Sequence, residues 1–304
     1  MSLDTRKVQY FIALFEEGSM KRAAERHNIV QPAMSMQLKQ LEAELSIQLF
    51  ERSSQGIQPT PAGRHFYKLC IGLQRDLQSA RQEMLDFGSR VVGSIRLGLM
   101  PSICRGPFAR ILTRYCDEYP NVEIKVFEAT SGALADMLLA GDLDFAVCNR
   151  PVSQTRLKLQ PVFNAPIALV SGRATRKKHG VSCDLAELSG LKLVLPTRSN
   201  SLRRLVDRKI KAGTIRASRI IEIDGLSGTM SFIESSDWST LVPSIALIND
   251  ISSKRFIVNP VAAPELVSEI FEMHNPDRPL SLPGQRMVAA IRSVLGAEPA
   301  AAGS

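Results

Sequence analysis

Apolar side chains recur at helical spacing through the first fifty residues. This spacing predicts three helices: one that Gly18 ends, a short one over Met20–His27, and a third that begins at Gln31. Pro32 fits the first turn of the third helix, where its missing N–H costs nothing. Two helices joined by a tight turn at 28–30, with another packed behind them, form a helix-turn-helix. The apolar positions of the first and third helices are Val8, Phe11, Ile12, Phe15, Met34, Leu38, Leu41 and Leu45.

A polar stretch and one long helix follow. Glu51–Gln58 contains Gly56 and predicts a short hairpin, or wing. From Pro61 to about Arg90 the apolar residues form a heptad seam with one extra four-residue step. Such a stripe packs either on its own domain or, as we expect here, against a second copy in a coiled coil. Its positions are Phe66, Leu69, Leu73, Leu77, Ala80, Met84, Phe87 and Val91.

From Gly93 onward strands and helices alternate. Two strand–helix–strand steps imply a parallel sheet whose ligand crevice lies at the carboxyl ends of the strands. A second α/β unit follows, and a final strand and helix complete the chain. The predicted strands are Ser94–Leu99, Val122–Phe127, Phe145–Cys148, Ile167–Ser171, Lys192–Leu195, Ile220–Ile223, Ser239–Val242 and Glu269–His274. The predicted helices are Pro107–Tyr119, Gly132–Ala140, Ser201–Ala212 and Leu282–Leu295, and the tail 296–304 is expected to be disordered.

Composition narrows the class of protein. Of the 304 residues, 44% are hydrophobic and 22% charged, as in a soluble globular protein, and no apolar run approaches the roughly 18 residues of a membrane helix. The N-terminus lacks the layout of a secretion signal, so a cytoplasmic location without a membrane partner is expected. The five cysteines show no CxxC spacing and the four histidines no HxxxH pair. GxSxG, GxxxxGK[ST] and GxGxxG are absent too, so neither an enzyme nor a metal or other cofactor is signalled.

The net charge of +8 favours anionic partners but is distributed unevenly. Residues 1–90 hold 12 basic and 10 acidic side chains, and residues 91–304 hold 26 and 20. The N-terminal part is therefore only weakly basic. The surplus in the C-terminal part has two interpretations, a solubilising surface such as Arg173–His179 or a site for an anionic ligand.

The run from Ser19 to Arg64 closely resembles the DNA-binding head of LysR-type transcriptional regulators. It contains, in the family's order and spacing, S-x-x-x-A-A, Q-P-A-x-S-x-Q-L, L-E-x-x-L, L-F-x-R and T-x-A-G. Further segments are similar to the family's effector-binding domain, namely GSIRLGLMPS, EYPNVEIKVFE, LLAGDLDFAV and RPLS. The resemblance covers nearly the whole chain and is weakest from about 163 to 263.

The resemblance implies an α/β protein with an N-terminal, all-α winged helix-turn-helix. It implies a DNA-binding domain at 1–59, a linker or dimerisation helix at 60–90 and an effector-binding domain at 91–304. The last would hold two Rossmann-like subdomains of periplasmic-binding-protein type, subdomain I (91–162 with 268–304) and subdomain II (163–267). Such a regulator would bind dyad-symmetric promoter sites on double-stranded DNA as a homotetramer built from two dimers, with RNA polymerase as a candidate partner. The competing interpretation is a metabolic enzyme or solute-binding protein whose N-terminal helices serve oligomerisation.

A DNA-reading face follows from the helical wheel of the third helix. Pro32, Met36 and Lys39 point away from its apolar stripe, with Ser35 at the edge, which suits insertion into the major groove. The resemblance makes Gln31, Pro32, Ser35 and Met36 groove contacts and Arg52 a minor-groove or phosphate contact, while Lys39 would meet phosphate. Many relatives carry Arg where Met36 stands; Met cannot form a bidentate bond to guanine and would favour a thymine methyl. Ser19 and Thr60 either donate to phosphates or cap helices.

An effector site is predicted in the crevice between the subdomains. Ser102 follows the first strand of subdomain I, and Thr130 and Ser131 follow the next, so their hydroxyl and nearby N–H groups can receive a carboxylate. In subdomain II, Arg198, Ser199, Asn200 and Ser201 follow a strand and could close over the other end. Trp238 could form a wall for an aromatic ligand, and Arg105 could supply a counter-charge. Helix capping for Ser102 and Ser201, solvation for Arg198 and packing for Trp238 are the alternatives.

Overall fold

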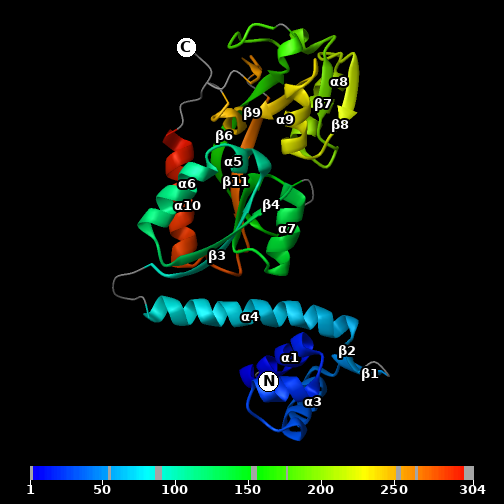
Figure 1. Cartoon of the computed structure of the whole chain (residues 1–304), viewed down its shortest axis with the longest axis vertical. Helices are drawn as coiled ribbons and strands as arrows, with labels where there is room; N and C mark the ends of the chain where they lie inside the picture. The colour runs from blue at the N-terminus through cyan, green and yellow to red at the C-terminus, as the bar shows by residue number, and fades with distance from the viewer. Residues whose placement is uncertain are drawn as a thin grey trace. The chain divides into compact units, whose positions relative to one another are not determined.

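The computed structural model describes residues 3–53, 56–85, 91–151, 156–175, 177–250, 255–263 and 266–297. The chain divides into two compact units, 1–85 and 86–304, each with its own hydrophobic core (Figure 1).

The first unit is the winged helix-turn-helix with the start of a long helix. Its elements are α1 (Thr5–Glu17), α2 (Met20–Arg26), α3 (Gln31–Leu45), the hairpin β1 (Phe50–Ser53) and β2 (Gly56–Pro59), and α4 (Pro61–Leu85). Gly18 ends α1 as predicted, in the left-handed conformation with φ of 60°. The predicted apolar positions of α3 are buried at Met34, Leu38 and Leu41.

Aromatic contacts fix the first turns of α4 on α1. Phe15 and Tyr67 stack with ring centroids 3.9 Å apart and planes 8° apart, and the Tyr67 hydroxyl donates to Glu16 Oε1 at 2.9 Å. Phe66 packs on Phe11 at 4.9 Å. Of the predicted long helix, residues 86–90 lie outside the described part of the chain.

The second unit is built on one mixed sheet with the strand order β4-β3-β5-β11-β6-β9-β7-β8, and β10 also pairs with β6. The strands are β3 (Gly93–Leu99), β4 (Val122–Glu128), β5 (Phe145–Asn149), β6 (Lys158–Ser171), β7 (Lys192–Leu195), β8 (Arg219–Glu222), β9 (Ser239–Pro243), β10 (Ile257–Pro260) and β11 (Val267–His274). The helices are α5 (Pro101–Arg105), α6 (Phe108–Glu118), α7 (Ser131–Ala140), α8 (Ser201–Lys211), α9 (Leu226–Glu234) and α10 (Leu282–Ala297), with short 3-10 turns η1 (Arg173–Thr175), η2 (Ala186–Leu188) and η3 (Ser244–Leu247).

Parallel strands form the centre of subdomain I. β3 pairs in parallel with β4 and β5, while α6 and α10 lie on one face of the sheet and α7 on the other (Figure 1). The buried Tyr115 hydroxyl donates to Pro283 O at 2.8 Å and so ties α6 to α10. Asp144, in the segment LLAGDLDFAV, accepts from the Arg96 guanidinium at 2.6 Å and from its backbone N–H at 2.7 Å. These bonds fix the approach to β5.

The structure corrects several boundaries. β6 is one strand of 14 residues that runs through both subdomains, whereas only 167–171 were predicted. Pro161 and Pro166 are untypical of a strand and therefore obscure the sequence pattern of its first half. This half pairs with β11, with a bulge near Ile270. β11 is antiparallel to β5, so the sheet is not wholly parallel. The elements α5, α9 and β10 were not predicted; α10 continues to Ala297, and the rest of the predicted disordered tail lies outside the described residues.

Candidate functional site

The outer face of α3 is open. Gln31, Pro32, Met36 and Lys39 are exposed, Met36 by 55%, and Ser35 is half-buried. Among the described residues, none of these side chains has a hydrogen bond or ion pair. No side chain caps the start of α3, so the first-turn N–H groups of this 15-residue helix also stay available to an anion.

Internal bonds hold α3 and the wing in place. Lys7 of α1 pairs with Glu44 at 2.5 Å. Glu42 accepts from the backbone N–H groups of Leu49 and Phe50 at 2.7 and 3.1 Å, which explains the glutamate of the L-E-x-x-L pattern. Glu42 therefore ties the start of the hairpin to α3.

The remaining predicted DNA contacts flank α3. Ser19 stands at the start of α2, but its hydroxyl makes no capping bond, so it stays available to a phosphate. Of the two roles predicted for Thr60, phosphate contact and helix capping, the structure shows capping. The Thr60 hydroxyl donates to Gln48 O at 2.8 Å and accepts from Gly63 N at 3.0 Å. Arg52 pairs with Ile57 in the hairpin, and its side chain lies outside the described part of the structure.

In the second unit, the carboxyl ends of β3, β4 and β5 meet at one edge. Met100 N donates to Val147 O at 3.1 Å, and Ala129 N donates to Leu99 O at 3.2 Å, so the loops that follow these strands adjoin. Ser102 lies here with 5% exposure, and its hydroxyl has no hydrogen-bond partner among the described residues. An orphaned buried hydroxyl of this kind calls for a ligand or water.

Thr130 and Ser131 occupy the start of α7 at the same edge. The Thr130 hydroxyl caps the helix through Ala133 N at 3.5 Å, and Ser131 is its first residue. Sequence reasoning missed Glu128, which ends β4 beside Cys104. Burial, and then the Glu128 carboxylate, raise the pKa of the Cys104 thiol to about 12. This edge of the sheet therefore holds three hydroxyls, those of Ser102, Thr130 and Ser131, and the Glu128 carboxylate.

In subdomain II the predicted residues surround the start of α8. Asn200 caps the helix through Leu202 N at 2.9 Å, and the Ser199 hydroxyl bonds to that of Thr197 at 2.8 Å. Arg198, with its side chain 81% exposed, lies 3.7 Å from Asp207.

Two candidates have internal partners. Trp238 is 8% exposed and packs in the core of subdomain II, 5.8 Å from the Phe232 ring and under the Arg219 guanidinium at 5.6 Å. This is the packing alternative, and it leaves little of the indole for a ligand. Arg105, expected as a counter-charge, pairs with Asp250 at 2.6 Å, because α5 packs against the segment around η3. Gly106 allows this approach, since a Cβ there would lie 2.0 Å from Ile245 O.

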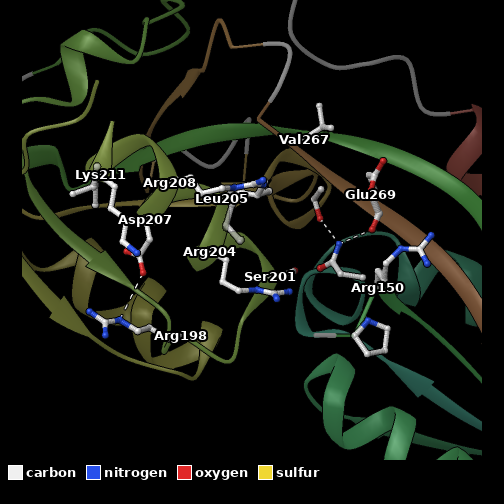
Figure 2. A pocket seen from close by; sticks show the side chains of 15 residues that line it. Arg150, Arg198, Ser201, Arg204, Leu205, Asp207, Arg208, Lys211, Val267 and Glu269 are labelled. Atoms are coloured by element: carbon white, nitrogen blue, oxygen red, sulfur yellow. Dashed lines mark hydrogen bonds and ion pairs between the residues drawn. The ribbon is translucent and has the colours of Figure 1, made fainter. Parts of the chain in front are cut away.

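A cavity of about 1130 Å³ opens between α8 and the strand ends of subdomain I (Figure 2). Arg198 and Ser201 line it, as Figure 2 shows, but Ser102, Thr130 and Ser131 do not. Its other cations were not predicted from the sequence, although positions 204, 208 and 211 share one helix face. Those cations are Arg150, Arg204, Arg208 and Lys211, and the carboxylates are Asp207 and Glu269.

Within the described ranges, no helix is both long and apolar enough to cross a membrane, and no cluster of three or more histidines, cysteines or carboxylates could hold a metal ion.

Comparison with known families settles the class of protein. Residues 5–64 match the family described as bacterial regulatory helix-turn-helix protein, lysR family, and residues 88–296 match the LysR substrate binding domain. The chain belongs to the LysR family of transcriptional regulators. It is accordingly a DNA-binding regulator with a substrate-binding domain and not an enzyme, which removes the competing interpretation.

Individual relatives of this LysR-type regulator support the assignment to the family. The nitrogen assimilation regulatory protein nac of Klebsiella aerogenes is 30% identical over 245 residues, 80% of this chain and 79% of the relative. The full-length OxyR of Pseudomonas aeruginosa has the same fold with a TM-score of 0.69 and 20% identity, covering 98% and 96% of the two chains. CbnR, solved in complex with its target DNA, gives a TM-score of 0.63 at 20% identity over 96% of this chain and all of CbnR.

Proposed function

We propose that this regulator reads dyad-symmetric promoter sites through α3 and responds to a small acid bound between its two α/β subdomains. The observation that carries the first part is the unpartnered outer face of α3, where Gln31, Ser35 and Met36 would contact base edges and Lys39 a phosphate. Arg52 and Ser19 would add backbone contacts. The structure solved for CbnR with target DNA supports this placement by similarity of fold.

Pairing of two heads follows from α4. Leu69, Leu73 and Leu77 are exposed by 49, 39 and 51% at helical spacing, an apolar stripe that a second copy of α4 would cover. Two paired heads would address successive major grooves. Pairs of dimers would form the tetramer, with RNA polymerase as a candidate partner on the promoter.

The effector part rests on the charge distribution across the crevice. The Glu128 carboxylate disfavours an acid group near Cys104 and the start of α5, whereas cations gather at α8. We therefore expect the acid group to face Arg198, Ser199, Asn200 and Ser201 and a polar group to reach the buried Ser102 hydroxyl, with Thr130 and Ser131 beside it.

DNA binding is tested with the region upstream of the regulator's own gene. Affinity should fall steeply with salt, because phosphate contacts release counterions. Lys39→Ala should weaken binding and flatten the logarithmic salt slope by about 1, since one phosphate is no longer neutralised. Lys125→Ala, an exposed change in the second unit, is the matched control and should leave the slope unchanged. Salt-independent binding, or equal effects of the two variants, would overturn the proposal.

A further inference from the structure

The cavity beside α8 combines unpaired cations on one wall with hydroxyl-binding groups on the other. Arg204 and Arg208 lie one turn apart on α8, and in Figure 2 both side chains extend toward the strand that carries Glu269. Among the described residues neither guanidinium has an ion-pair partner. Arg204 Nε is moreover buried without a hydrogen-bond partner there, which points to a ligand that completes it.

The neighbouring carboxylate on α8 does not neutralise these arginines. Asp207 is engaged by Arg203 at 2.7 Å and lies 3.7 Å from Arg198. Arg203 also bonds to Glu222 at 2.7 Å and to Pro196 O, so it fixes the base of α8 and is not free to bind a ligand. The Ser201 hydroxyl, one turn before Arg204, also has no partner within the described part of the chain. Two guanidinium forks and a hydroxyl within two helical turns match a phosphoryl group.

The opposite wall offers different chemistry. Asn149 Nδ2 donates to Ser268 Oγ at 2.8 Å and to Glu269 O at 2.7 Å, which leaves its Oδ1 as an acceptor. Glu269 is exposed and has no ion pair among the described residues. Both groups accept from hydroxyl groups, and a carboxylate there would repel a second anionic group. Arg150 stacks on Phe271 at 4.7 Å and borders this wall.

We propose that the cavity binds a phosphorylated sugar or polyol, with the phosphoryl group on Arg204, Arg208 and Ser201 and the hydroxyls on Asn149 and Glu269. A volume of about 1130 Å³ accommodates a ligand of this size. Because α8 belongs to subdomain II and Asn149 to subdomain I, the ligand bridges the two. This inference rests on the proposed function for its regulatory meaning and names the class of acid that the regulator senses. It places that acid in a cavity that Arg198 and Ser201 line and that Ser102, Thr130 and Ser131 do not.

The test measures binding to the full chain by calorimetry with four probes: inorganic phosphate, glucose 6-phosphate, glycerol 3-phosphate and unphosphorylated glucose. At least one organic phosphate should bind more tightly than inorganic phosphate, and glucose should not bind. Arg204→Gln and Arg208→Gln should each weaken both kinds of phosphate about tenfold. Glu269→Gln should weaken the organic phosphate and leave inorganic phosphate unchanged or slightly tighter.

Arg216→Gln is the matched control, an exposed arginine of subdomain II outside the cavity, and should change affinity less than twofold. Arg208 is exposed, so its variant keeps the test valid if Arg204→Gln disturbs folding. Absence of phosphate binding, or equal losses for Arg208→Gln and Arg216→Gln, would overturn the inference. DNA affinity is measured on the same samples. Phosphate binding without any DNA binding would refute the proposed function alone. DNA binding without phosphate binding would refute only the inference.

Discussion

Arg105 and Asp250 join α5 to the segment after η3 through an ion pair of 2.6 Å between Nη2 and Oδ2. Arg105 ends α5, the short helix that carries the buried Ser102, and Asp250 follows η3, which packs against α5. The Asp250 side chain is only 7% exposed, so the ion pair is largely shielded from water. The pair therefore helps to hold α5, and with it Ser102, against the segment around η3.

Removing one partner of this pair should be costly. Arg105→Ala should lower the free energy of unfolding of the second unit by about 3 kcal/mol, because it removes the cation that lies 2.6 Å from the nearly buried Asp250 carboxylate. Trp238, the single tryptophan, reports unfolding of this unit in urea by fluorescence. The double variant with Asp250→Ala should lose less than the sum of the single variants. Lys192→Ala, which breaks an exposed pair with Asp237, should cost less than about 1 kcal/mol, and an equal loss would contradict this account.

Gly63 should tolerate no side chain. A Cβ there would lie 2.1 Å from Leu49 O, so Gly63→Ala must displace the wing from α4, at about 2 kcal/mol. Amide hydrogen exchange in α1 should become faster in this variant. Gly132→Ala, whose Cβ meets nothing within 4 Å, is the matched control and should leave exchange in α1 unchanged. Unaltered exchange in both variants would show that the close approach of Gly63 to Leu49 is unimportant.

Three cysteines should resist alkylation. Burial raises the pKa of the thiols of Cys70, Cys104 and Cys148 to about 12. At pH 8 their thiolate fraction is about a thousandfold below that of an ordinary thiol. Iodoacetamide should therefore label these three cysteines only at the rate at which the protein unfolds, whereas the exposed Cys116 should be labelled without delay.

The raised pKa values of the same thiols also predict how the stability of the fold changes with pH. Since their folded pKa values lie above the ordinary value of 9.0, their stabilising contribution is complete below pH 9 and is lost as the pH rises toward 12. Rapid labelling of Cys104 at pH 8 in the folded protein would contradict both the slow alkylation and this pH dependence.

The apolar stripe of α4 should hold the dimer together. Leu73→Arg should raise the dimer dissociation constant about a hundredfold or more, because it places a charge in the proposed seam. Sedimentation velocity measures the shift toward monomer. Lys68→Gln, an exposed change on the same helix, is the control. A dimer indifferent to Leu73→Arg would show that pairing uses another surface.

Local pattern predicted most of the fold but less of the effector site. The stripe at Met34, Leu38 and Leu41 specified α3 and hence its exposed face, because helical period alone decides which residues are buried. The full length of β6 could not be predicted, since its first half contains two prolines and forms a strand by pairing with the distant β11, with a bulge beside Pro161. The cationic cavity was not predicted either, because Arg150 and Arg204 are far apart in the sequence and line one cavity only in the folded chain.

Binding-site selection from random DNA tests the central claim, that α3 reads sequence, most directly. The wild-type chain, Ser35→Ala, Met36→Arg and Lys39→Ala would each be selected under identical salt. The account predicts that Ser35→Ala alters the preferred half-site, that Met36→Arg adds a guanine preference through a bidentate bond, and that Lys39→Ala keeps the wild-type motif with lower affinity for every site. If all four proteins selected the same motif, the exposed face of α3 would not be the reading surface.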